Sequence, residues 1–320
     1  MKLRRVILIF LPLLAVTVLL GLCFGSVSLS RLLAGEETAR LILWQLRLPR
    51  VAAGVLAGLG LSTSGGLLQT VTANDLAGPN IIGVNSGAGL AVIGLLTFAP
   101  GAGKLLPLAA FLGAFAAALL IAAVAGRMGA SRSGIVLIGI AVTTVFNAAI
   151  SFLSLLDEGV LAQYNHFTVG SLKGVRLEEL LLPSVLIFAA FLGSLAIGHS
   201  LGTLCLGDAA AAALGVRVKA LRLTALALAA ACAAAVVSFA GLLGFVGLMV
   251  PHISRALVGP RPRKLLIASA LVGGVLVVLA DLLGRVLAAP SELPVGILLS
   301  LVGGPYFLIL LVRRKRHAGI

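Results

Sequence analysis

The chain has 320 residues, of which 60% are apolar and 11% charged, and it carries a formal net charge of +14. A soluble domain carries about 25% charged residues, so this composition excludes a sizeable soluble domain and predicts an integral α-helical membrane protein. The positive charge does not indicate nucleic-acid binding, because aromatic residues amount to only 5% and the basic residues gather at the ends of apolar runs, where they meet lipid headgroups.

The first segment, MKLRRVILIFLPLLAVTVLLGLCFG, has the basic-then-apolar order of a signal peptide. Its apolar part runs from Val6 to about Phe24, whereas the apolar core of a signal peptide has about 7–15 residues. We therefore expect 6–26 to be a retained first helix. Leu22 weakens a lipoprotein interpretation of Cys23, because a small residue is expected before that cleavage site.

Further apolar runs follow, each bounded by a short polar segment. Together with the first they make ten expected spans: 6–26, 51–70, 81–98, 105–126, 134–156, 180–198, 221–240, 243–257, 265–288 and 294–312. The span 81–98 is short and rich in glycine. The apolar run 223–251 is too long for one upright helix, so we divide it near Phe239–Leu243 and expect a short helix at 243–257.

The Lys and Arg residues indicate the orientation of the chain. If both termini are cytoplasmic, sixteen of the 24 lie on the inner side, seven on the outer side, and Arg285 within a span. This excess satisfies the positive-inside rule and predicts an even number of spans with both termini cytoplasmic. Four arginines between the first two spans run against the rule: Arg31, Arg40, Arg47 and Arg50.

Two polar interruptions at membrane depth indicate a transport path. The segment NDLAGPNIIGVNSGAG, 74–89, is the first, and a second at 238–260 contains Pro251 and His252. Interrupted backbone at this depth is tolerated only where protein or a water-filled cavity surrounds it.

The two interruptions occupy corresponding places in two groups of spans. Each follows the first span of a possible four-span group, 51–156 and 221–312, and the groups would start on opposite sides of the membrane. This is the pattern of an inverted repeat, whose interface holds the path in many transporters. The alternative is that the two interruptions mark no transport path, because glycine and proline are common in the helices of any membrane bundle. We expect a single transmembrane domain over 1–320.

Other functional patterns are missing from the sequence. The segment GAGK, 101–104, lacks both the earlier glycine and the following Ser or Thr of a phosphate-binding loop. The four histidines fall on separate segments and the three cysteines lack ligand spacing, so we expect no metal site and no cofactor. Asp281 and Arg285 are four residues apart and can pair on one helix face. A proton relay usually needs more than this one buried carboxylate.

Three long motifs carry a family resemblance. They are WQLRLPRVAAGVLAGLGLSTSGGLLQTVTANDLAGPNIIGVNSGAGL at 44–90, GLLGFVGLMVPHISRALVGPRPRKLL at 241–266, and LADLLGRVLAAPSELPVGILLSLVGGPYFLILL at 279–311. From about residue 6 to 314 the chain resembles the permeases of binding-protein-dependent ABC importers for iron–siderophores, haem and cobalamin. The resemblance implies an all-α, type II importer fold with ten helices per subunit, two permease subunits and two separate ATPase subunits.

The resemblance also implies two docking surfaces. A cytoplasmic coupling segment at about 204–219 would dock into the ATPase dimer. Its proposed contact residues are Leu206, Gly207, Asp208, Leu214 and Gly215. On the outer face, arginines at three matching positions would receive glutamates of the binding protein. They are Arg47 and Arg50, expected to be exposed just outside the second span, and Arg285, which approaches the outer surface in the ninth. The alternative is that these arginines lie at the membrane interface and contact lipid headgroups instead of a binding protein.

The resemblance also implies a cytoplasmic gate, whereas the histidine of the short helix is interpreted from its expected burial. The gate would lie at the start of the fifth span, with Ser131 and Ser133 as candidates, although Arg132 departs from the small polar residue expected between them. For His252 we expect a structural role with a fixed hydrogen-bond partner.

We therefore expect a multi-pass protein of the bacterial cytoplasmic (inner) membrane that imports an iron complex, a siderophore or haem, and is not itself an enzyme. Its expected partners are an ATPase dimer, a periplasmic or lipid-anchored binding protein, membrane lipid, and a second permease, either another copy in a homodimer or a homologous chain. Cobalamin or an oxyanion are alternative substrates. A secondary transporter and an intramembrane enzyme are alternative classes; the first fits the broken helices, and the second lacks a visible nucleophile–base pair.

Overall fold

The computed structural model describes residues 2–24, 37–128, 132–288 and 291–317, in which every regular element is helical. The helices are α1 (Leu3–Cys23), α3 (Glu37–Ile42), α4 (Leu48–Thr72), α5 (Val84–Phe98), α6 (Leu106–Arg127), α7 (Arg132–Ser154), α8 (Glu158–Val169), α9 (Leu177–Ala196), α10 (Gly198–Leu204), α11 (Asp208–Ala213), α12 (Val218–Ala240), α13 (Val246–Val258), α14 (Pro262–Leu287) and α15 (Val295–His317). A π-helical turn occupies Leu43–Arg47, and 3-10 turns occupy Pro79–Ile82 and Pro100–Leu105.

A helix lies at each of the ten expected spans, so the apolar runs do fold as helices. Within the described ranges, seven segments are long and apolar enough to cross a membrane: Leu3–Cys23, Arg40–Thr72, Pro100–Arg127, Ser133–Ser154, Leu177–Ala196, Val218–Ala240 and Pro262–Leu287. Three apolar helices are shorter, namely α5, α13 and Val295–Leu310 of α15. The all-helical fold is confirmed, and ten crossings stay a prediction.

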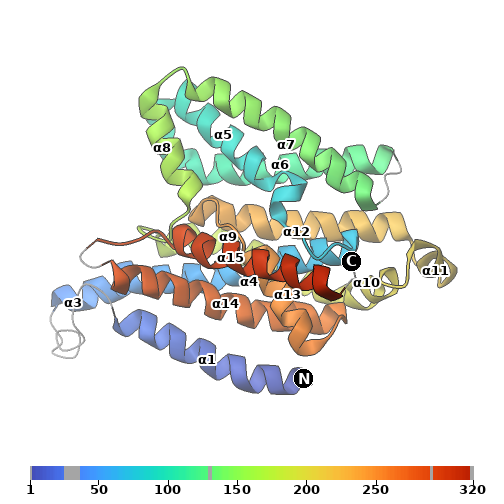
Figure 1. The fold of residues 1–320 in the computed structure, drawn as a ribbon. Helices are drawn as coiled ribbons and strands as arrows, with labels where there is room; N and C mark the ends of the chain where they lie inside the picture. Colours follow the sequence, from blue (N-terminus) through green and yellow to red (C-terminus); the bar gives the residue numbers. More distant parts are fainter. Residues whose placement is uncertain (1, 25–36, 129–131, 289–290, 318–320) are drawn as a thin grey trace.

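Figure 1 shows two groups of helices on either side of α12. Helices α5, α6 and α7 lie together on one side, and α1, α4, α13 and α14 lie on the other. The two chain ends lie at the same end of the bundle as α10 and α11, while α3 and α8 lie at the opposite end (Figure 1). This arrangement fits termini on one side of the membrane; that this side is the cytoplasm stays a prediction.

Helix α4 lies at the centre of the second group and is buried along most of its length. Gly58 meets Gly273 of α14, and Gly65 meets Gly247 of α13, so closely that a methyl group on Gly58 or Gly65 would overlap the facing backbone. Small residues allow this approach, and tight van der Waals packing then holds membrane helices together without help from water exclusion.

The expected division of the apolar run 223–251 is confirmed. Helix α12 ends at Ala240 and α13 begins only at Val246. Between them the chain turns at Gly241, with φ of 68°, and at Phe245, with φ of 64°. A side chain in this left-handed region costs of order 1–3 kcal/mol, which the surrounding packing must offset.

The two interruptions meet each other although they are far apart in the sequence. The Nε2 of Gln69, near the end of α4, donates to the carbonyl of Leu248 in α13 at 3.1 Å. Arg255 of α13 pairs with Asp75, just beyond α4, and its Nη2 donates to the Oε1 of Gln69 at 3.3 Å. The two interruptions are therefore held together by protein contacts, which is how interrupted backbone is tolerated at membrane depth.

Candidate functional site

The approach to α4 places two of the expected arginines on one side of the helix. The π-helical turn Leu43–Arg47 runs directly into α4, and Pro49 lies in the first turn, where a missing N–H costs little. Arg47 and Arg50 are three residues apart and therefore share a face. They are only 4% and 8% exposed, so the expectation of exposed side chains is wrong.

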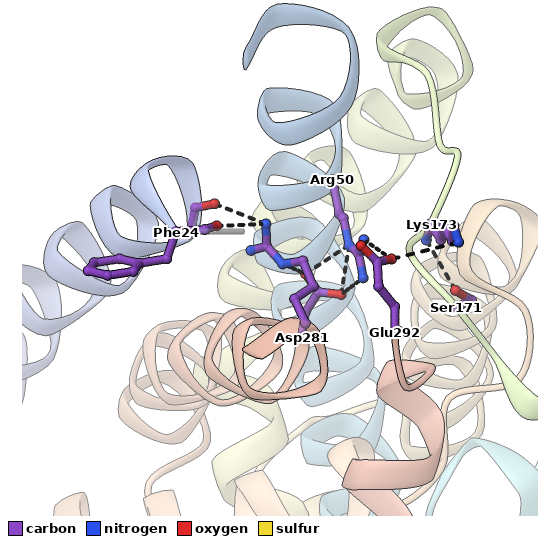
Figure 2. A network of polar contacts seen from close by, with 8 residues as sticks. Phe24, Arg50, Ser171, Lys173, Asp281 and Glu292 are labelled. Carbon is purple, nitrogen blue, oxygen red and sulfur yellow. Dashed lines mark hydrogen bonds and ion pairs between the residues drawn. The ribbon is translucent and has the colours of Figure 1, made fainter. Parts of the chain in front are cut away.

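Arg50 is held by two carboxylates from the carboxyl-terminal part of the chain. Its Nε lies 3.0 Å from both oxygens of Asp281 in α14, and its Nη2 lies 2.9 Å from Oδ1. Its Nη1 donates to the Oε2 of Glu292 at 2.8 Å (Figure 2). Glu292 lies between α14 and α15, so Arg50 ties α4 to both.

Arg285 completes the group from the same helix as Asp281. The expected pairing four residues apart is confirmed, with 3.2 Å between the Nε of Arg285 and the Oδ2 of Asp281. Arg285 is only 6% exposed, so it is buried near the end of α14 together with Asp281. Asp281 thus serves as the shared counter-ion of two arginines from two helices.

The end of α1 supplies backbone acceptors for the other guanidinium groups. Arg47 Nη1 donates to the carbonyls of Leu22 at 2.8 Å and Cys23 at 2.9 Å. Arg285 Nη1 donates to the carbonyls of Gly21 at 3.1 Å and Phe24 at 3.4 Å. The last carbonyls of a helix lack partners within it and carry partial negative charge, so cations are stabilised there.

A cavity of about 120 Å³ opens beside these groups. It is lined by Ile42, Leu46, Arg47, Arg50, Lys173, Gly174, Val175, Arg285 and Glu292. Four basic side chains at this site face two carboxylates, Asp281 and Glu292. The buried Nη2 of Arg285 has no hydrogen-bond partner among the described residues. The arrangement suits an additional anion, and we call these six charged residues the arginine cluster.

Sequence reasoning found the three arginines and missed their acidic partner Glu292 and their neighbour Lys173. A signal was present, because counting the ten expected spans from a cytoplasmic amino terminus places Lys173 and Glu292 on the same outer side as Arg47 and Arg50. Burial raises the pKa of Glu292, but the hydrogen bond and charge of Arg50, with the charges of Lys173 and Arg285, lower it below its usual value overall. Glu292 is therefore ionised at neutral pH.

The expected coupling segment lies at the opposite end of the bundle, where α10 and α11 lie (Figure 1). Leu206 and Leu214 flank α11 and are 68% and 64% exposed. Gly207 and Gly215, with φ of 104° and 80°, end the flanking turns in a conformation that other residues rarely adopt. Asp208 begins α11, where a negative charge suits the helix dipole.

A salt bridge fastens α11 to the membrane helices. The carboxylate of Asp208 lies 2.8 Å from the Nη2 of Arg222 in α12. The segment therefore combines exposed apolar side chains with a fixed position, which is what a docking helix needs.

The remaining expected residues are only partly placed. Ser133 lies exposed in the first turn of α7, and Ser131 lies outside the described residues, so the gate stays a prediction. His252 meets Tyr306 of α15 edge to face, with 6.3 Å between the ring centroids. This contact ties the short helix α13 to α15. Among the described residues, no group of three or more His, Cys, Asp or Glu could hold a metal ion.

Comparison with known proteins identifies a family. The model of the FecCD transport family matches residues 13–313. The chain is similar to the iron(3+)-hydroxamate import system permease protein FhuG of Bacillus subtilis (strain 168), with 38% identity over 292 residues, 87% of this chain and 86% of that protein. It is also similar to the hemin transport system permease protein HmuU of Yersinia pestis, with 37% identity over 327 residues, 98% of this chain and 97% of that one.

The fold agrees with these relatives. The solved structure of an inward-facing conformation of a metal-chelate type ABC transporter matches with a TM-score of 0.89 and 30% identity, over 97% of this chain and 99% of that chain. Sequence and fold therefore point to the same family over nearly the whole chain. The protein belongs to the FecCD transport family and is a multi-pass membrane permease of the ABC importer class.

Proposed function

We propose that this permease imports an iron complex, a siderophore or haem, across the cytoplasmic membrane with energy from a separate ATPase dimer. Family membership over residues 13–313 carries the proposal. The relatives named for ferric hydroxamate and for hemin are 38% and 37% identical, so similarity does not separate the two substrates. Cobalamin and oxyanions stay alternatives within the same class.

Two surfaces at opposite ends of the bundle suit the two kinds of partner. The exposed leucines around α11 form an apolar docking surface for the ATPase dimer on the cytoplasmic side, where both termini lie. The arginine cluster forms the outer docking site, where glutamates of a periplasmic or lipid-anchored binding protein meet Arg47, Arg50 and Arg285. Arginine suits this task because its planar guanidinium binds a carboxylate through two parallel hydrogen bonds.

A second copy of the chain would complete the transport path. Helix α7 is only 17% buried over its most apolar window. Its exposed large side chains are Leu137, Ile140, Val145 and Phe152. A helix with so little cover from its own chain fits a position between lipid and a second permease.

Secondary transport receives no support from the site. A proton-coupled carrier needs a carboxylate that can take up and release its proton. Asp281 is held by Arg50 and Arg285 and serves as their counter-ion. The cluster is therefore built to keep its charge.

The function is tested by uptake into proteoliposomes that contain the permease and its partner ATPase. Binding protein is loaded in turn with a ferric hydroxamate, haem or cobalamin. We expect ATP-dependent uptake of one of the two iron complexes. Uptake of cobalamin alone would reject the iron proposal, and uptake driven by an ion gradient without ATP would reject the importer class.

The coupling surface is tested in the same vesicles. Leu214→Glu places a charge on the proposed apolar contact, and we expect ATPase association and stimulated hydrolysis to fall at least about tenfold, the effect of about 1.4 kcal/mol. Leu156→Glu is the matched control, because Leu156 is 56% exposed between α7 and α8 at the far end. Equal ATPase association for both variants would remove α11 from the interface.

A further inference from the structure

The two carboxylates of the arginine cluster are held in different ways. Asp281 lies within helix α14, is 3% exposed and contacts two arginines. Glu292 lies outside any helix, in the segment before α15, and its side chain is 25% exposed. One oxygen of Glu292 receives Arg50 Nη1 at 2.8 Å and lies 3.9 Å from Lys173 Nζ (Figure 2). Asp281 is thus held by the backbone of a helix, whereas Glu292 is held by a segment outside the helices.

Glu292 also lines the cavity that an incoming anion would enter. The cavity volume of about 120 Å³ is several times the roughly 10–15 Å³ that a cavity needs to hold one water, so a carboxylate group fits. The unpartnered Nη2 of Arg285 is buried beside it. A second carboxylate placed there would be repelled by Glu292 and attracted by the basic groups.

We propose that Glu292 is an internal, exchangeable ligand of the arginine cluster, which occupies Arg50 in the free permease and yields it to a carboxylate of the docking partner. This inference rests on the docking role proposed above for the cluster. It identifies Glu292 as a competitor of the partner and Asp281 as the permanent counter-ion.

The exchange has a physical rationale in the charges. Asp281 alone would be one carboxylate for two buried arginines, and a guanidinium buried with too little opposite charge is costly, so a free permease without Glu292 would be less stable. An internal carboxylate avoids this cost, because one carboxylate replaces the other and the charge of the site is unchanged. Because Glu292 competes with the partner's carboxylate for Arg50, docking is weaker. The binding protein can therefore leave after it has delivered its substrate.

The experiment compares binding kinetics for three variants of the assembled permease–ATPase complex in nanodiscs. The probe is the binding protein that supports ATP-dependent uptake in the vesicles described above, immobilised on a sensor at low and at high salt. Glu292→Gln keeps the size and hydrogen-bonding groups of the side chain and removes its charge. Arg47→Gln tests docking itself, and Glu158→Gln controls for the loss of any exposed acid at this end, because Glu158 is exposed on α8.

We expect Glu292→Gln to lower the Kd about two- to tenfold, mainly by slowing dissociation, since a partly exposed competing ion pair is worth up to about that much. Arg47→Gln should raise the Kd, more at low salt than at high salt. Glu158→Gln should match the wild type. A thermal-unfolding midpoint measured for each variant shows that the fold is kept.

Each other result leads to a distinct conclusion. If Glu292→Gln binds as weakly as Arg47→Gln, Glu292 positions Arg50 for the partner, and exchange is rejected. If Arg47→Gln weakens docking while Glu292→Gln changes nothing, docking stands and exchange is again rejected. If neither substitution changes binding, the docking proposal itself fails.

Discussion

Gly65→Ala is expected to abolish the folded permease or to destabilise it by at least about 3 kcal/mol, the upper range for overpacking a core. The added methyl group would overlap the backbone carbonyl of Gly247, and backbone atoms cannot step aside as a side chain can. Helices α4 and α13 would have to separate, which would break the contact between Gln69 and Leu248. The measurement is the thermal-unfolding midpoint and the yield of monodisperse protein in detergent.

Gly94→Ala is the matched control for this substitution. Gly94 also lies within a helix, α5, and a methyl group there would meet no atom within 4 Å. Alanine favours the helix over glycine by about 1 kcal/mol, so this variant should be as stable as the wild type or slightly more stable. Equal stability of the two variants would show that α4 and α13 do not pack as closely as described.

Asp281→Asn is expected to destabilise the permease by about 3–5 kcal/mol, the cost of removing one partner from a buried ion pair. Asparagine keeps the size of the side chain, but Arg285 loses its only carboxylate among the described residues, and Arg50 keeps Glu292 alone. The loss of stability should appear as a lower thermal-unfolding midpoint and as a poor yield of protein extracted from membranes. Both measurements require no transport assay.

Two further variants serve as controls. One removes a different acid at the same end of the bundle, and the other changes the shape of residue 281 but keeps its charge. Glu178→Gln removes an exposed acid at the same end of the bundle and should change stability by less than about 0.5 kcal/mol. Asp281→Glu keeps the charge and should recover part of the stability. If Asp281→Asn is as stable as Glu178→Gln, the arginines do not depend on Asp281 as a counter-ion.

Helix positions could be predicted from the sequence because they depend on local information. An apolar run of spanning length has no other stable conformation in lipid, so the ends of α12 and α13 follow from Gly241 and the turn after it. The pairing of Asp281 with Arg285 is local in the same sense, since a helix places residues four apart on one face. The motifs that carry the resemblance are equally continuous in the sequence.

The contacts of the arginine cluster could not be predicted in this way. Arg50 and its partners Asp281 and Glu292 are separated by 231 and 242 residues, and no sequence period connects them. Arg47 and Arg50 were expected to be exposed because they lie just outside the second span, at positions where the resemblance implies docking. The burial of the arginines depends on the end of α1, whose carbonyls receive Arg47 and Arg285, and that position is set by packing against α14.

The glycine contacts of α4 also determine when this protein can fold during its synthesis. Helix α4 ends at Thr72 and its glycine partner α14 begins at Pro262, so about 190 residues separate them. At roughly 5–20 residues per second, the ribosome needs about 10–40 seconds to supply that partner. Until then α4, with Ser62, Ser64 and Gln69 along its length, has no α14 to cover it. The membrane insertion machinery or the neighbouring helices must shelter it during translation.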